Sequence, residues 1–298
     1  MRAFLSRQRR RLTWMMRPRR GVGIKEFDAH TNRWVDVETA IPVQRDELTF
    51  ATFNIWFSDH HATARYHAIA DLLEAHSPDV IALQEVTPPA LEVFLARPLI
   101  RQHYHRAAAT GHAFGRNGLL LLSRLPMSHA VYTHLPRSVG RGLLQASLTV
   151  NGRALTICSL HLESGKSASE IRAHQLATVF RAVDTAENAV LCGDFNLRDA
   201  EGSRLPETWV DAWPALHPSD EGFTEDTSVN LMLNDSKGKP RKVRFDRILV
   251  KGDGWVPADI RLLGTEPISQ TTPRVFPSDH FGLLCRVVPA GRAVIADA

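Results

Sequence analysis

The chain has 298 residues, of which 44% are hydrophobic and 23% are charged, values typical of a globular chain with a sizeable core. No apolar run reaches the length needed to cross a bilayer, which argues against a membrane-spanning protein. The net charge is +4, but residues 1–20 hold eight arginines and no acid, which leaves 28 basic and 32 acidic residues in the remainder. The basic character therefore belongs to the N-terminal tail and not to the body of the chain.

We interpret residues 1–20 as a basic, disordered tail with several possible uses. It could bind nucleic acid or an anionic lipid surface, could direct the protein to an organelle or the nucleus, or could have no specific role. The apolar stretch from Leu12 to Met16 is too short for a secretory signal. The three cysteines, Cys158, Cys192 and Cys285, lie in apolar strand-like runs without a CxxC spacing. They indicate buried free thiols in a reducing compartment, and we expect the cytoplasm.

The predicted elements begin with an N-terminal extension over residues 21–45. Within it, residues 27–37 resemble a small hairpin around Thr31-Asn32. A strand, an amphipathic helix and a fully apolar strand follow, at residues 48–56, 62–76 and 79–86. This order predicts a buried sheet with a helical layer outside it.

Further strand-like and helical segments continue to the C-terminus. Asn151-Gly152, between residues 143–150 and 153–160, is the strongest hairpin signal of the chain. The other predicted elements are a strand at 118–123, a helix at 168–183, a strand from 190, an irregular stretch from 199 to about 234, a basic loop at 236–244, and strands at 245–250 and 281–288. No repeat or low-complexity linker divides them, so we expect one domain over residues 46–290.

Polar side chains recur where these strands end. They are Asn54, Glu85, His161, Asp194 with Asn196, Asp246, and Asp279 with His280. Each has an ordinary alternative: a turn asparagine, a surface carboxylate, a core histidine, an Asx turn, or a salt bridge from Asp246 to Arg247. Ligands of α/β sheets bind at strand ends, so the coincidence favours a functional site.

Six motifs occur in the order found in the endonuclease/exonuclease/phosphatase superfamily. They are Thr52-Phe-Asn54, Leu83-Gln-Glu-Val86, Ser159-Leu-His-Leu-Glu-Ser164, Gly193-Asp-Phe-Asn-Leu-Arg-Asp199, Phe245-Asp-Arg247 and Ser278-Asp-His-Phe-Gly282. Within that superfamily the chain most resembles the metal-dependent, type 2 family of 5′-tyrosyl-DNA phosphodiesterases. The resemblance spans about residues 48–288 and includes segments outside the catalytic signature, such as Ser77-Pro-Asp-Val80 and Leu262-Leu-Gly264. It implies a DNase I-like, two-sheet α/β sandwich in a single domain.

The resemblance also implies a role for each site residue. Asp194 would accept a proton from the attacking water that Asn196 orients, and His280, fixed by Asp246, would donate to a phosphate oxygen. Glu85 would bind Mg²⁺, for which Mn²⁺ could substitute, with help from Asn54 and Asp279, and Asn54 could also hold the phosphate. His161, Ser164 and Arg198 would contact phosphate and substrate.

Three positions depart from the family pattern. Trp56 stands where an acid is expected, which removes a probable metal or water ligand, and Phe195 stands where a threonine is familiar. Phe223 stands where a tryptophan is expected and keeps a face for stacking on substrate. Trp56 either packs under the sheet edge or offers such a face itself, and Asp59 is an alternative source of the missing charge.

The predicted activity is hydrolysis of a 5′-phosphotyrosyl-DNA bond, which leaves a 5′-phosphate. The site shows a base and charge stabilisers but no dedicated acid, and this suits a phenolate leaving group with a pKa of about 10. We expect a monomer that binds single-stranded 5′ ends carrying a protein adduct. The basic loop holds Lys237, Lys239, Arg241, Lys242 and Arg244, which could follow the strand or simply be solvated.

Other activities of the superfamily remain open at this stage. The alternatives are an exonuclease, a deadenylase-like enzyme, or a phosphoinositide or sphingomyelin phosphodiesterase. A binding protein without catalysis would be expected to lack Asp194, Glu85 or His280, and all three are present.

Overall fold

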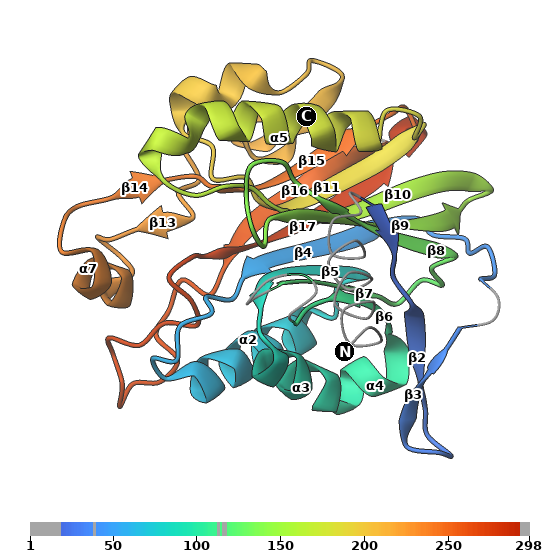
Figure 1. The fold of residues 1–298 in the computed structure, drawn as a ribbon, viewed down its shortest axis with the longest axis horizontal. Helices are drawn as coiled ribbons and strands as arrows, with labels where there is room; N and C mark the ends of the chain where they lie inside the picture. The colour runs from blue at the N-terminus through green and yellow to red at the C-terminus, as the bar shows by residue number, and fades with distance from the viewer. Residues whose placement is uncertain (1–18, 38–39, 112–113, 115–117, 293–298) are drawn as a thin grey trace, which may run out of the picture.

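The computed structural model describes residues 19–37, 40–111, 114 and 118–292, and within these ranges two large β-sheets stack face to face (Figure 1). Most of the basic tail lies outside the described residues, although Arg19–Gly21 forms strand β1. No helix in the described ranges is long and apolar enough to pass through a bilayer.

The first sheet has seven strands. In spatial order they are β1 (Arg19–Gly21), β8 (His129–His134), β9 (Gly142–Val150), β10 (Arg153–His161), β11 (Asn188–Asp194), β15 (Asp246–Lys251) and β12 (Trp209–Asp211). Strands β10 and β11 are parallel, and their register pairs His161 with Asp194. Strand β15 runs antiparallel to β11 and pairs Asp246 with Asp194. The register alone therefore brings three predicted site residues to one edge.

The second sheet has eight strands. In spatial order they are β16 (Trp255–Leu263), β17 (Gly282–Pro289), β4 (Leu48–Asn54), β5 (Val80–Val86), β7 (Gly118–Ser123), β6 (His105–Ala109), β2 (Ile24–Asp28) and β3 (Arg33–Asp36). The predicted hairpin around Thr31-Asn32 is confirmed as β2 and β3, and it joins the sheet through β6. A separate two-stranded ribbon pairs β13 (Glu225–Asp226) with β14 (Lys242–Val243).

Helices cover the outer faces of both sheets, so the sandwich has four layers (Figure 1). Over the eight-stranded sheet lie α2 (Ala62–His76), α3 (Pro88–Ala96) and α4 (Pro98–His103). Helix α5 (Ser169–Ala182) covers the seven-stranded sheet, and α7 (Leu231–Lys237) lies beside the ribbon. Helix α6 (Ala212–Leu216) packs against β15 and β16 and contributes Ala212 and Trp213 to the core between the sheets. Short 3-10 turns occupy Lys166–Ala168, Asp199–Arg204 and Ala290–Arg292.

Strand β5 shows why an apolar run forms the centre of this fold. Val80 and Ala82 face the core between the sheets, whereas Ile81 and Leu83 pack toward the helices on the other face. Side chains alternate along a strand, so a strand with both faces covered has to be apolar throughout. The predicted buried sheet with an outer helical layer is confirmed.

Local signals are also confirmed at the Asn151-Gly152 turn and in α2. Asn151 and Gly152 have φ values of 54° and 76°, as a two-residue hairpin turn requires. Helix α2 has the predicted bounds and ends at Ser77, before Pro78. The three cysteines are buried and free, and burial raises the pKa of Cys285 to about 12.

The stretch after Asp199, predicted to be irregular, differs from that expectation. It contains β12, α6, β13 and α7, and the predicted basic loop includes the end of α7 and strand β14. These elements are two to seven residues long. Hydrophobic periodicity cannot be recognised over so few residues, because a helical or strand pattern needs several repeats.

Candidate active site

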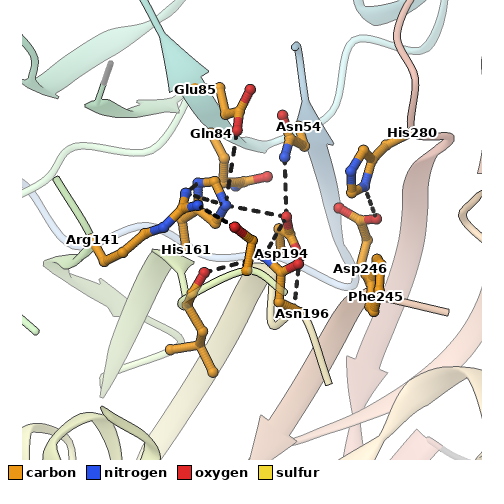
Figure 2. A network of polar contacts seen from close by, with 12 residues as sticks. Asn54, Gln84, Glu85, Arg141, His161, Asp194, Asn196, Phe245, Asp246 and His280 are labelled. Carbon is orange, nitrogen blue, oxygen red and sulfur yellow. Dashed lines mark hydrogen bonds and ion pairs between the residues drawn. The ribbon is translucent and has the colours of Figure 1, made fainter. Parts of the chain in front are cut away.

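The predicted strand-end residues gather where the two sheets meet at one edge (Figure 2). Asn54 at the end of β4 donates from Nδ2 to Oδ2 of Asp194 at the end of β11, at 3.0 Å. This bond joins the two sheets at the site. Behind it, Gln84 donates to Ser159 Oγ at 3.0 Å, also from one sheet to the other. Neither Gln84 nor this cross-link was predicted.

Asp194 is the centre of the cluster and is 1% exposed. Its Oδ1 accepts from the Asn196 backbone N–H at 2.8 Å, and its Oδ2 accepts from Asn196 Nδ2 at 3.0 Å. The Asx turn considered from the sequence is therefore present, and the same carboxylate also faces the site. Burial alone would raise the pKa of Asp194, but His161, His280 and Arg141 together hold it below its usual value.

The backbone before Asp194 requires glycine. Gly193 has φ of 144°, and a Cβ there would come within 2.1 Å of the Leu160 carbonyl oxygen. Strand β11 approaches β10 so closely just before the carboxylate that no side chain fits at this position. Asn196 lies in the left-handed region with φ of 50°, which turns its amide back to Asp194.

His280, just before β17, is held between two carboxylates. Its Nδ1–H donates to Asp246 Oδ2 at 2.8 Å, as predicted. Its Nε2 lies 3.4 Å from Glu225 Oε1. Burial would lower the pKa of His280, but Asp246, Asp279 and Asp194 raise it well above its usual value, so the ring is an imidazolium.

Glu225 is a site residue that the sequence analysis missed. It is 3% exposed, burial raises its pKa, and it forms an ion pair with Arg241. It comes from β13, a strand of two residues in the stretch interpreted as irregular. No local pattern could have identified it.

His161, at the end of β10, has different neighbours. Its Nε2 lies 3.2 Å from Asp194 Oδ2, and Arg141 Nη1 lies against both ring nitrogens, 2.7 Å from Nδ1. Arg141 also donates to Ser164 Oγ at 3.2 Å, so His161 and Ser164 are brought together through it. Arg141 was not predicted, because it precedes β9 in a loop without a motif.

Glu85 departs from the regular strand. It has φ of 62° and lies at a register shift between β5 and β7. Its Oε2 accepts from the Phe57 N–H at 3.0 Å, and its Oε1 is 4.0 Å from His161 Nε2. The bulge re-aims this side chain toward the site.

The site also holds oxygen donors suited to a hard divalent cation. Glu85, Asn54 and Asp279 are all buried, so the two carboxylates are largely withdrawn from solvent. Glu225, Asp279 and His280 also form a compact cluster, whose potential ligand atoms lie within 4.8 Å of one another; with His280 protonated, only the two carboxylates of this cluster can bind a cation. Buried carboxylates in this number favour a bound cation, so the donor chemistry fits a metal ion.

The remaining predicted contacts line the rim. Arg198 lies over the Phe245 ring at 5.6 Å, with Arg241 at 5.1 Å from the same ring. Phe223 is half-buried, with Lys242 Nζ 5.9 Å from its ring. These side chains offer cationic and aromatic surfaces next to His280.

Trp56 is half-buried between an apolar cluster and a pocket. It packs against the cluster of Met232, Val275, Phe276 and Phe281, and it also lines a pocket of about 400 Å³. Asp59, the alternative source of the missing charge, is exposed.

The basic loop is tied down by ion pairs within the protein. Arg244 and Arg247 both pair with Asp211, whereas Asp246 is hydrogen-bonded to His280. Lys242 pairs with Asp226 at 3.2 Å, and Lys237 Nζ lies 3.9 Å from Asp279. A continuous phosphate track along this loop is therefore not supported.

Residues 51–280 match the model of the endonuclease/exonuclease/phosphatase family. The chain belongs to this family. Tyrosyl-DNA phosphodiesterase 2 of Homo sapiens is 33% identical over 255 residues, which cover 80% of this chain and 68% of that protein. The Xenopus laevis protein of the same name is 32% identical over 262 residues, covering 83% and 68%.

A solved family structure has the same fold. TDP2 of D. rerio, complexed with a single-strand DNA product, has a TM-score of 0.72 and 26% identity, and the match covers 82% of this chain and 99% of that one. The predicted family and two-sheet architecture are confirmed.

Proposed function

We propose that this chain is a metal-dependent phosphodiesterase of DNA repair that hydrolyses the 5′-phosphotyrosyl-DNA bond and leaves a 5′-phosphate. The observation that carries the proposal is the joining of Asn54, Asp194 and Asn196 beside the His280–Asp246 pair, in a chain whose relatives are named for this activity. Fold alone would not distinguish the activities of this family.

Asp194 is the proposed general base. It accepts the proton of a water whose oxygen attacks phosphorus, while the bond from phosphorus to the phenolic oxygen breaks. The hydrogen bonds from Asn54 and Asn196 fix the carboxylate, both at 3.0 Å, and Asn196 orients the water.

His280 is the proposed stabiliser of the phosphate charge. Its imidazolium donates from Nε2 to a nonbridging oxygen as negative charge grows there. Asp246 fixes the ring through Nδ1. Glu225 stands at Nε2 in the structure, so the phosphate has to share or take that position.

Glu85, with Asn54 and Asp279, is the proposed holder of the metal. We propose Mg²⁺, with Mn²⁺ as a substitute, because oxygen donors suit hard cations that keep part of their water shell. Bound there, the ion supplies Lewis-acid polarisation of the phosphate.

The substrate is proposed to be a single-stranded 5′ end that carries a protein adduct. A phenolate leaves with a pKa of about 10 and needs little protonation. His161, Ser164, Arg198 and Arg141 contact the phosphates, and Phe223 and Trp56 provide stacking faces. We propose that the enzyme acts as a monomer in a reducing compartment.

A substrate panel tests this proposal. It compares a 5′-phosphotyrosyl single strand with plain single and double strands, an abasic duplex and a phosphoinositide, using Asp194→Asn protein as the control for contaminating nucleases. We expect the tyrosyl adduct to be cleaved fastest. Faster cleavage of the abasic duplex or the phosphoinositide would refute the assignment.

A further inference from the structure

Arg65 is a charged side chain with no exposed surface, in the first turn of α2. A guanidinium has five N–H groups. In this structure each of them has a carbonyl partner. The acceptors are His60 at 2.7 Å, Ile55 at 2.9 Å, Pro277 at 3.3 Å, Trp56 at 3.1 Å and Ser58 at 2.7 Å.

These acceptors belong to two segments that flank the active site. Four of the carbonyls lie between residues 55 and 60, directly after Asn54, and the fifth belongs to Pro277, three residues before His280. Arg65 forms no ion pair with a carboxylate in the described part of the chain. The backbone carbonyls, and the Trp56 ring at 4.7 Å, thus take the place of a counter-ion.

The segment that Arg65 holds has an unfavourable backbone. Trp56 has φ of 57° and His61 has φ of 48°. A bulky side chain at positive φ is a genuine outlier, and such a conformation persists only where the surroundings impose it. The carbonyl contacts of Arg65, supported by Tyr66 Oη at 3.4 Å from the Trp56 oxygen, impose it here.

The strained segment in turn holds two proposed metal and phosphate residues. The Trp56 N–H donates to Asn54 Oδ1 at 3.1 Å, and the Phe57 N–H donates to Glu85 Oε2 at 3.0 Å. Burial lowers the pKa of Arg65, whereas Tyr66, Asp279 and Glu85 act in the opposite direction. The buried cation therefore also lies in the field of two carboxylates of the proposed metal site.

We infer that Arg65 is a positioning residue of the active site, which sets the backbone of residues 55–58 so that the amides of Trp56 and Phe57 orient Asn54 and Glu85 for the metal and the phosphate. The inference rests on the proposed function, because that function makes the orientation of Asn54 and Glu85 matter. Groups that orient metal ligands typically change metal affinity or activity by about 10- to 100-fold when they are removed.

The test measures Mn²⁺ binding to the free enzyme by electron paramagnetic resonance, together with the Mg²⁺ dependence of turnover. Arg65→Lys keeps the charge but has only three donors, and Arg65→Met removes both. We expect each folded variant to bind Mn²⁺ at least about tenfold more weakly, with turnover partly recovered at high Mg²⁺. Wild-type Mn²⁺ affinity in folded Arg65→Lys would overturn the inference.

Arg97→Met is the matched control. Arg97 also anchors α2, through Asp71 and Glu74, but at the opposite end of the helix from the site. This variant should be less stable, with unchanged Mn²⁺ affinity. An equal loss of affinity in Arg97→Met would reduce the role of Arg65 to general stability.

Two further variants keep the test decisive if Arg65 cannot be replaced. Trp56→Gly removes the indole beside the Arg65 guanidinium but tolerates positive φ, so Mn²⁺ affinity should fall far less than in Glu85→Gln. A loss as large as in Glu85→Gln would show that the indole, and not Arg65, holds the segment. If Glu85→Gln itself binds Mn²⁺ normally, the proposed metal site fails, whatever the Arg65 variants do.

Discussion

The two histidines of the site have opposite surroundings. His280 lies between the carboxylates of Asp246 and Glu225, at 2.8 Å and 3.4 Å. His161 has a carboxylate, Asp194, on one side and the guanidinium of Arg141 on the other. Arg141 Nη1 lies against both ring nitrogens of His161, so a cation stands beside this ring where His280 has carboxylates. The same residue type thus faces anions in one case and both an anion and a cation in the other.

The contrast between the two histidines shows that the side chains around each ring determine its electrostatic environment and its role. The raised pKa of His280 follows from the carboxylates around it, and these come from three separate parts of the chain. The cationic neighbour of His161 is one arginine in a loop before β9. Substitutions that affect only His161 or only His280 are the best test of this difference.

Asp194 contacts His161, and the charge of His280 lowers its pKa. Substitution of Asp194 should therefore have the largest effect. Asp194→Asn removes the proposed base and is expected to lower kcat by at least ~10²-fold while the fold remains intact. Steady-state kinetics and thermal unfolding of the same preparation check this. Near-wild-type turnover in a pure sample would remove Asp194 from the mechanism.

His280 and His161 should contribute different amounts to the rate, and substituting them should change different kinetic constants. His280→Ala loses the donor to the developing charge, so kcat should fall by at least ~10²-fold. His161→Gln keeps hydrogen bonding without a ring, and we expect a loss of roughly tenfold, mostly as a higher KM. Equal losses in kcat for both variants would contradict the difference in role.

The support beneath His161 predicts a pH-dependent stability. Arg172 donates to the Glu163 and Gly165 carbonyls and pairs with buried Glu201. Burial alone would raise the pKa of Glu201, but Arg172, Ser169 and the Arg198 backbone lower it from 4.5 to about 2. A carboxylate whose pKa is lower in the folded state than in the unfolded state stabilises the fold when the pH is above the unfolded-state pKa. This stabilisation is lost as the pH falls through the folded-state pKa.

Glu201→Gln should therefore be less stable than wild type by roughly 2–3 kcal/mol at pH 7. The difference should shrink as the pH falls from 4.5 toward 2, as measured by urea unfolding across that range. A difference that does not change with pH would show that the charge of Glu201 contributes nothing.

Substitution of Glu225 should have a smaller effect, confined to the pH dependence that His280 determines. A group with a raised pKa loses its proton as pH rises through that pKa, so the alkaline limb of kcat/KM reports His280. Glu225→Gln removes an anion beside Nε2 and should move that limb to lower pH, with less than about tenfold change in rate at neutral pH. Exposed Glu221 lies in the same segment, and Glu221→Gln is the control.

The smallest predicted effect concerns Trp56. Trp56→Asp should lower the Mg²⁺ concentration for half-maximal rate by roughly threefold, because a second carboxylate joins Glu85. Asp59→Ala should leave it unchanged, since Asp59 is exposed. The reverse pattern would identify Asp59 as the missing ligand.

The sequence by itself determined the elements whose signals are local. Helix α2, the Asn151-Gly152 hairpin and the apolar strand β5 follow from side-chain periodicity and turn chemistry within a few neighbouring residues. The ends of β4, β5, β10 and β11 were recognisable for the same reason, because an apolar run stopped at a polar residue. Only the resemblance to a known family gave those residues their proposed roles.

The tertiary structure alone decided which partners these residues meet. Asn54 bonds Asp194 across 140 positions of sequence, and Ser278 donates to the Asn54 carbonyl across 224. Glu225, Arg141 and Arg65 carry no local pattern, yet they contact His280, His161 and the backbone after Asn54. The physical reason is that protonation and orientation depend on distance and burial, which the packing of two sheets creates between residues far apart in the chain.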